Sequence, residues 1–413
     1  MRTIGLKKTL AASLALAACF VGLVGCTSSS SDDPVVDPDS VTLGLLLPFT
    51  GADSATSSNF ERGALYAAKR VNDGGGISGK RLRIVSRDTH SELAAGEQSA
   101  QWLVDSGAKV VIGPESAALA PALYPMLTQN GVALLSPLVG AGPDPTFDCS
   151  MPWFRLAPSA KAMGENLAKL IVAQKVSAVA IIYADDAYNA ALSEALRGIF
   201  VSRGGSVPLE LEVAANAQSY AGTVQAVVQA GLQSVVLATS ARAGALLVNE
   251  FDALSSGHLR WFLSPQLKTE LLVANVAPDA LEGALGVAPQ IFDTSSDFPD
   301  AFAREWGGDR PLEGAYFYYD AVALLSFALQ KAATEPGSVT LAELSDIVRD
   351  VAKSPGEYQK WNEVEIGLSR IREGDDIYYT GLTGPMLLGQ CGDRLQGMKT
   401  DFAVENGRIV DKQ

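Results

Sequence analysis

The stretch that most constrains the fold is residues 109–137, KVVIGPESAALAPALYPMLTQNGVALLSP. A short apolar run ends at a Gly-Pro pair, and a second apolar run ends at Ser136 and Pro137. Between them, apolar residues recur at helical spacing over 117–128, and an Asn-Gly pair ends that pattern. A strand, a helix and a strand in so short a stretch predict a parallel βαβ unit.

This unit also predicts where a ligand binds. In an open parallel sheet, ligands bind beyond the carboxyl ends of the strands. Here those ends are followed by residues 113–116 and 136–139. We therefore expect these two loops to form one wall of a ligand cleft.

The flanking sequence extends the pattern into two α/β layers. Apolar strand runs at 41–47 and 82–85 alternate with helical patterns at 59–71 and about 93–105. The resulting order β-α-β-α-β-α-β predicts a doubly wound α/β layer. A second series of alternating strands and helices runs over 176–263 and predicts a second layer.

The N-terminus has the pattern of an export signal. Residues 1–25 have a basic start and an apolar run that is shorter than the ~20 residues a bilayer requires. Cys26 follows that run, and residues 27–40 are polar and contain proline. We predict a signal peptide over 1–25 and a flexible tether over 26–40.

Composition and motifs disfavour several classes of function. The formal net charge of −14 argues against binding nucleic acid or an anionic lipid surface. The four cysteines fit no zinc site, and the chain contains no GxSxG, HExxH or Walker sequence. The three glycines at 74–76 follow a helical pattern, so they predict a helix end. We expect no catalysis, no metal and no cofactor.

Several motifs together resemble the type I periplasmic solute-binding proteins, within the branched-chain amino-acid-binding group. Their order and spacing agree over almost all of the chain after the leader. They are LLLPFTG at 45–51, VNDGGGISGKRLRIVSRD at 71–88, VVIGPESA at 110–117, LLSPLV at 134–139, FRLAPS at 154–159 and IIYADDAYNAAL at 181–192.

The resemblance implies an α/β fold of two doubly wound parallel-sheet lobes, joined by three crossovers and closing on a ligand by hinge motion. The first lobe is expected over 41–155 and 287–390, and the second over 156–286 and 391–413. Residues 353–376 fit the pattern poorly, and we interpret them as a loop or small insertion. The implied fold brings the neighbourhoods of Cys149 and Cys391 to the crossovers, so we expect a disulfide between them.

The leader carries a second resemblance. The sequence Leu-Val-Gly before Cys26 resembles the bacterial lipobox, which implies that Cys26 becomes the lipidated N-terminus. The alternative is an ordinary cleaved signal with an incidental cysteine.

At the positions that align with the family's ligand pocket, this chain lacks the usual hydroxyl and acidic residues. Two hydroxyl positions that hold a ligand carboxylate align with Ala117 and Gly140, and two acidic positions that hold the ammonium align with Ala160 and Gln266. Since a desolvated zwitterion needs both charges compensated, we infer a ligand other than a free α-amino acid held in the usual way. The predicted ligand contacts are Thr56, Ser116, Ala117, Ser136, Leu138, Gly140, Tyr188 and Gln266.

Alternatives remain open at this point. An alignment shift of one or two residues would make Ser116 the carboxylate donor, and Tyr188 could serve the core instead of the ligand. The resemblance implies a monomeric solute-binding lipoprotein on the periplasmic side of a bacterial membrane, delivering a small solute to an ABC permease. The alternative function is an envelope sensor or regulator built on the same fold.

Overall fold

Five parallel strands form the first sheet, in the order β2-β1-β3-β4-β5. The computed structural model describes residues 33–116, 118–139, 153–254, 259–290, 296–353, 355–395 and 399–412. Leu43, Leu45 and Leu47 of β1 pack on one face of the sheet and Leu46 on the other. Both faces are buried, which explains why the strand is apolar throughout. The strands are β1 (Ser40–Leu47), β2 (Arg81–Asp88), β3 (Ala108–Ile112), β4 (Ala133–Ser136) and β5 (Trp153–Arg155).

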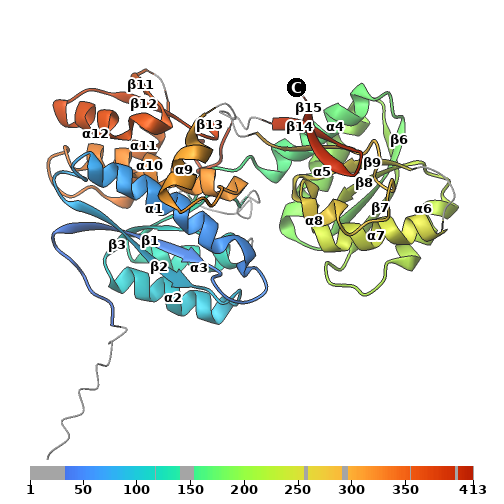
Figure 1. Ribbon diagram of the computed structural model, residues 1–413, viewed down its shortest axis with the longest axis horizontal. Coiled ribbons are helices and arrows are strands. Elements are labelled where there is room, and N and C mark those ends of the chain that lie inside the picture. Colours follow the sequence, from blue (N-terminus) through green and yellow to red (C-terminus); the bar gives the residue numbers. More distant parts are fainter. Residues whose placement is uncertain are drawn as a thin grey trace, which may run out of the picture. The chain divides into compact units, whose positions relative to one another are not determined.

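Helices cover both faces of this sheet, and sheet and helices together form the first lobe (Figure 1). The core on one face joins β1 to α1 and α10, and the core on the other face joins it to α2 and α3. The helices of this lobe are α1 (Ser57–Asp73), α2 (Leu93–Asp105), α3 (Leu119–Gln129), α9 (Phe298–Glu305), α10 (Glu313–Ala332), α11 (Leu341–Asp350) and α12 (Val364–Glu373).

Helix α10 lies at the centre of the first lobe. It is buried on nearly its whole circumference, as a helix that is apolar all round must be. It packs against α1, α11 and α12, and α1 runs beside it in Figure 1. Gly63 of α1 permits the close approach, since a Cβ atom there would lie 2.3 Å from the carbonyl oxygen of Ala315.

Residues 353–376 contain regular secondary structure, so they are not the loop that the sequence indicated as one possibility. Val364, Leu368 and Ile371 of α12 are buried in the core of the first lobe. Their spacing is helical, but charged neighbours dilute the apolar signal. The same region contributes to a three-stranded sheet of β11 (Glu357–Gln359), β12 (Ile377–Gly381) and β13 (Gly384–Pro385), with a 3₁₀ turn η3 (Trp361–Glu363).

The second sheet has the order β15-β14-β10-β9-β8-β6-β7. Strands β6 to β10 are parallel and repeat the order of the first sheet, while β14 and β15 run antiparallel at one edge. The strands are β6 (Ala178–Ala184), β7 (Ser206–Val213), β8 (Ser234–Ala238), β9 (Arg260–Leu263), β10 (Leu285–Pro289), β14 (Lys399–Glu405) and β15 (Arg408–Lys412). The predicted fold class, two parallel α/β layers, is confirmed.

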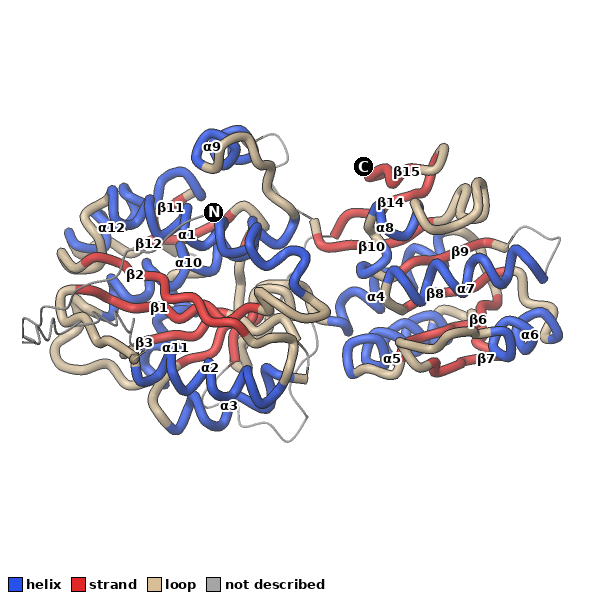
Figure 2. Tube along the Cα trace, turned by 60° about the horizontal axis from the view of Figure 1, so that its bottom comes forward, coloured by secondary structure: helices blue, strands red, loops and turns tan. Residues whose placement is uncertain are grey.

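Helices lie on both sides of the second sheet as well, and together they form the second lobe (Figure 2). Ile181 of β6 packs with α4 and α5, and its neighbour Ile182 packs with α6 and α7. The helices are α4 (Ala160–Ala173), α5 (Ala187–Ser202), α6 (Ala221–Gln229), α7 (Ala241–Leu254) and α8 (Glu270–Val273). Strands β14 and β15 form a hairpin, with Asn406 and Gly407 at positive φ in its turn.

Two expected lobe boundaries move by a few residues. Strand β10 pairs with β9 and β14, so all of 285–289 belongs to the second sheet. Asp393 and Arg394 instead contact Arg155 and Pro158, at the end of the first sheet. Strands next to a crossover are apolar in either lobe, so their pattern does not show where the lobe changes.

The two lobes belong to one of the two units into which the chain divides. The chain divides into Met1–Asp33 and Pro34–Gln413, and all the elements above belong to the second unit. The predicted signal peptide over 1–25 and Cys26 lie outside the described residues. Within the described ranges, none of the helices has the length and apolar character needed to cross a bilayer.

A buried carboxylate fixes α10 to the three-stranded sheet. The side chain of Asp320 is fully buried. It accepts hydrogen bonds from the Tyr379 hydroxyl at 2.9 Å, the Leu382 N–H at 2.9 Å, and both the N–H and hydroxyl of Thr383 at 2.8 Å. Burial raises the pKa of Asp320, and these four donors oppose that rise. The carboxylate therefore positions the 382–383 turn.

Arg394 extends this network to a crossover between the lobes. It is 3% exposed and donates to the carbonyl oxygens of Leu156 at 2.9 Å, Pro385 at 3.0 Å and Thr383. Burial lowers the pKa of Arg394 to about 10, and the charge of Asp320 opposes this shift. The Arg394 guanidinium thus holds residue 394 against the segment that follows β5, the last strand of the first sheet.

We predict that Arg394→Met destabilises the protein strongly. The change leaves three buried carbonyl groups without donors and removes the positive charge near Asp320, so the free energy of unfolding should fall by about 3–5 kcal/mol. Urea unfolding followed by circular dichroism measures it. The control is Arg310→Met, which breaks an ion pair exposed on both sides and should cost less than about 1 kcal/mol. Equal losses in the two variants would contradict a structural role for Arg394.

Candidate functional site

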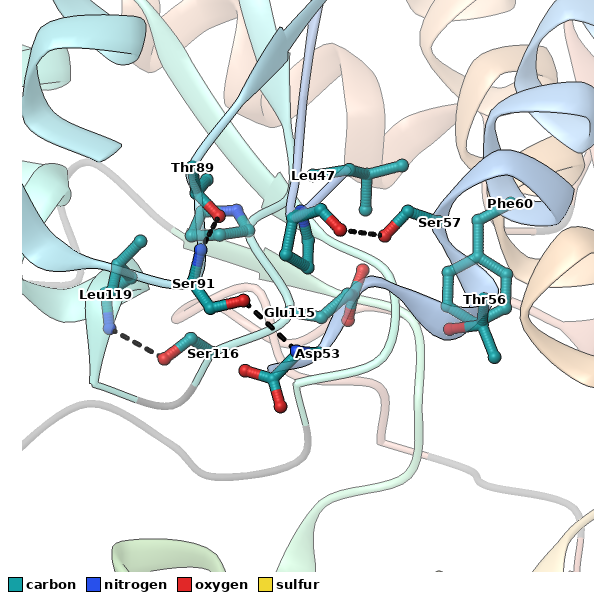
Figure 3. Close-up of a pocket in the computed structure, with 12 residues that line it drawn as sticks. Leu47, Asp53, Thr56, Ser57, Phe60, Thr89, Ser91, Glu115, Ser116 and Leu119 are labelled. Carbon is teal, nitrogen blue, oxygen red and sulfur yellow. Dashed lines mark hydrogen bonds between the residues drawn. The ribbon is translucent and has the colours of Figure 1, made fainter. Parts of the chain in front are cut away.

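A cavity of about 350 Å³ opens where strands β1 and β3 end. These strands are neighbours in the first sheet, and the chain leaves them toward opposite faces, as expected at a topological switch point. Hydroxyl groups and carboxylates dominate its polar lining. The lining residues, shown in Figure 3, are Leu47, Pro48, Asp53, Thr56, Ser57, Phe60, Thr89, Ser91, Pro114, Glu115, Ser116 and Leu119.

A second cavity of about 360 Å³ shares Phe60 and Glu115 with the first. Its lining comes from loops after strands of both sheets and from the start of α10. The other lining residues are Leu138, Val139, Ala157, Pro158, Tyr188, Pro265, Gln266, Pro289, Glu313, Gly314 and Phe317. We call the two adjoining cavities the candidate site.

Glu115 is the central polar group of the candidate site (Figure 3). One carboxylate oxygen accepts a hydrogen bond from the Tyr318 hydroxyl, and the other accepts one from the Leu138 N–H at 2.9 Å. Burial raises the pKa of Glu115 from 4.5 to about 7, against the lowering effect of these two donors. Its carboxyl group is therefore held in place by protein, and it still lines both cavities.

Phe60 forms an aromatic wall beside Glu115. Its ring stacks on Tyr318 with a centroid separation of 5.5 Å and an interplanar angle of 15°. Gly314 lies one helical turn before Tyr318, and a Cβ atom there would lie only 2.2 Å from the Phe60 ring. Helix α10 thus has a notch that lets the Phe60 ring lie across it.

The second lobe contributes a tyrosine and an amide to the site. Tyr188 packs partly against the core of that lobe, and burial raises the pKa of its hydroxyl. Gln266, in the 3₁₀ turn η2 (Pro265–Leu267), accepts a hydrogen bond from Asn189 at 3.1 Å through its side-chain oxygen. Asp186 caps α5 by accepting from the Asn189 N–H at 2.9 Å, so its role is structural.

Five of the ligand contacts predicted from sequence line one of the two cavities. Thr56 and Ser116 line the first cavity, and Leu138, Tyr188 and Gln266 line the second. The Ser116 hydroxyl oxygen accepts from the N–H groups of residues 118 and 119 at the start of α3, and its hydrogen remains able to donate.

Ser136 does not fit its predicted role as a ligand contact. It is fully buried and accepts a hydrogen bond from Trp153 Nε1 at 2.9 Å, and it lines neither cavity. Ser136 is the last residue of β4, and its side chain points into the protein interior. The sequence of the following loop does not indicate this orientation. Ala160, at an aligned acidic position, is buried in the core of the second lobe.

Four predicted residues cannot be placed. Ala117, Gly140, Cys26 and Cys149 lie outside the described residues. Cys391 is disulfide-bonded, and its pairing with Cys149 stays a prediction. The described residues contain no group of three or more His, Cys, Asp or Glu side chains arranged to bind a metal ion.

Sequence reasoning missed Phe60, Glu115 and Glu313. Glu115 has a recognisable signal, since it is a charged residue directly after a buried strand of the βαβ unit. Phe60 matches the apolar face of α1, so it is indistinguishable in sequence from a core residue. Glu313 comes from a helix far along the chain and reaches the site only through the tertiary fold.

The two lobes have the same strand order, and both contribute residues to a cavity at the strand ends. This arrangement defines a two-lobed α/β binding protein. The chain belongs to the periplasmic binding protein family, whose model matches residues 40–359.

Named relatives agree with this class. A Leu/Ile/Val-binding protein homologue of Brucella abortus is 23% identical over 343 residues, covering 82% of this chain and 88% of the relative. A second homologue, from Brucella melitensis, is 27% identical, but the match spans only 45% of this chain and 48% of the relative. An ABC transporter substrate-binding protein of Desulfitobacterium hafniense in complex with Leu shares the fold, with a TM-score of 0.69 and 22% identity over 90% of this chain and all of that one.

We predict that the ionised form of Glu115 destabilises the fold. Its pKa is raised above that of the unfolded chain, so the folded protein retains a proton between pH 4.5 and 7 that the unfolded chain releases. The free energy of unfolding should therefore fall as pH rises from 5 to 8, relative to Glu115→Gln, by up to about 3 kcal/mol before screening by water in the cavity. Urea unfolding at four pH values measures this difference. The exposed Glu305→Gln should follow the wild type, and a Glu115→Gln curve parallel to the wild type would refute the prediction.

Proposed function

We propose that this protein is an exported lipoprotein that captures a small organic solute and presents it to an ABC importer. The observation that carries the proposal is the candidate site itself, a cavity at strand carboxyl ends with lining residues from both lobes. Membership of the periplasmic binding protein family supports it, as do relatives named as Leu/Ile/Val-binding proteins. Capture then means closure of the two lobes on the solute, a hinge motion that residues near the crossovers permit.

The solute differs from the free branched-chain amino acids that those relatives' names indicate. The positions aligned with the usual carboxylate-binding hydroxyls hold alanine and glycine, and one aligned acidic position holds Gln266. The described lining adds aromatic surface from Phe60, Tyr188 and Phe317. A site of this kind suits a solute with an apolar body and few polar groups.

Attachment to the membrane would proceed through Cys26. The leader is cleaved before this residue, lipid is added to its thiol, and residues 27–40 act as the tether. We predict that Cys26→Ser abolishes incorporation of labelled fatty acid and releases the protein into the soluble periplasmic fraction. Labelling followed by fractionation measures both. The control is Ser28→Ala, which should leave both unchanged. Fatty-acid labelling that persists in Cys26→Ser would refute the assignment.

Solute capture is tested by titration calorimetry and thermal shift on the purified chain. The panel contains amino acids, amides, amines, short peptides, aromatic acids and sugars. A true ligand at about 100 times its Kd should stabilise the fold by about 2.7 kcal/mol, which raises Tm by several degrees. Leucine, isoleucine or valine binding as tightly as any other solute would contradict the altered pocket. If no solute binds, the receptor function fails, and the sensor or regulator reading takes its place.

A further inference from the structure

The charged groups that line the candidate site are all of one sign. Asp53 and Glu115 line the first cavity, and Glu115 and Glu313 line the second. Among the residues that the structure describes, no lysine, arginine or histidine lines either cavity. Segments 140–152 and 291–295, which come soon after the lining residues Val139 and Pro289 along the chain, contain no basic residue in their sequence. The site therefore offers carboxylates to its ligand without cations to balance them.

Glu115 and Glu313 are both half-buried, and they lack the cationic partners that carboxylates away from water usually have. Glu115 accepts hydrogen bonds from two neutral donors and has no cation beside it among the described residues. Glu313 makes no hydrogen bond or ion pair within the described part of the chain. The positive charge of Lys268 lowers the pKa of Glu313. The ammonium group of Lys268, however, forms an ion pair with Asp411 at 2.8 Å.

Structural roles explain these carboxylates only in part. Glu313 is in the first turn of α10, where a negative charge interacts favourably with the helix dipole. The Glu115 carboxylate accepts a hydrogen bond from the Leu138 N–H and so connects the two loops of the βαβ unit. A glutamine would serve that second role without the cost of burying a charge. Neither role requires the carboxyl groups to face the same cavity.

We propose that the ligand is a small organic cation with N–H donors and an apolar body, and that it carries no carboxylate. Its ammonium, amidinium or guanidinium group binds the carboxylates of Glu115 and Glu313, and its body lies against Phe60, Phe317 and Tyr188. The proposal rests on the solute-binding function proposed above and specifies its substrate class.

Physical chemistry favours this class over the alternatives. A cation in this cavity gains charge-assisted hydrogen bonds to two carboxylates, which are stronger than neutral hydrogen bonds. A ligand carboxylate in the same cavity would face like charges and no donor cation, a repulsion that acts as specificity against anions. The aromatic faces beside Glu115 add attraction for a positive charge.

The test compares ligands that share one hydrocarbon body and differ in charge. The first series is isoamylamine, isocaproamide, isocaproate and leucine, and the second is phenethylamine, hydrocinnamamide, hydrocinnamate and phenylalanine. Calorimetry on the full chain in mild detergent should give at least one amine a Kd about tenfold or more below those of its amide, carboxylate and amino acid.

Two neutral variants locate the charge that is recognised. Glu115→Gln and Glu313→Gln should each weaken amine binding by about tenfold or more and leave amide binding nearly unchanged. Glu305→Gln, an exposed carboxylate outside both cavities, should have no effect. Urea unfolding confirms that each variant is folded, and Glu313→Gln removes no hydrogen bond within the described protein.

A pH series gives an independent readout. Tyr318 donates to Glu115, while Asp53, Glu313 and Tyr188 are the other titratable groups lining the cavities. The amine stays charged from pH 6 to pH 8, so its affinity should rise as Glu115 ionises and should rise less in Glu115→Gln.

Several results would overturn the proposal. They are equal or tighter binding of a carboxylate or amino acid, amine binding that survives both glutamine variants, or no binding of any amine. If no amine binds but another solute class does, the cation assignment fails and the solute-binding function stands. If no solute of any class binds, both fail.

Discussion

The first lobe depends on one buried polar network centred on Asp320 and Arg394. Asp320 on the central helix accepts four hydrogen bonds, two of them from Thr383. The Thr383 hydroxyl oxygen in turn accepts a hydrogen bond from Arg394, which also donates to the carbonyl oxygens of Leu156 and Pro385. Each of these buried groups would be costly alone, so they are stable only as a set. The network holds the last part of the first lobe against the chain that leads into the second.

The repeated strand order explains why the candidate site lies where it does. In both sheets the second strand along the chain lies at the edge and the first lies inside it. This arrangement leaves a switch point next to β1 in one lobe and next to β6 in the other. The segments that follow β1 and β3 supply Phe60, in α1, and Glu115. The segments that follow β6 and β9 supply Tyr188, in α5, and Gln266, in η2. The binding surface is thus a consequence of topology, and its chemistry depends on a few loop residues.

Sequence reasoning predicted the layers and the cleft loops well, because the apolar runs and helix ends around residues 109–137 are local signals. It predicted α12 poorly, since only three apolar positions show its helical period among charged neighbours. It placed Ser136 in the site because the residue follows an apolar run, although strand alternation directs its side chain into the core. Glu313 could not be found at all, because only the packing of α10 on α1 brings it to the cavity.

The packing of α10 on α1 also sets the order in which the lobes can form during synthesis. Strands β1 to β5 emerge first, yet the face that carries Leu43, Leu45 and Leu47 is covered only in part, by α1, until α10 has been made. The parallel strands of the second lobe, β6 to β10, lie in one continuous stretch between these two parts. The second lobe can therefore assemble most of its sheet first, while the first lobe waits for distant partners. A chain that stops before residue 313 would expose an apolar sheet face and would be prone to aggregate.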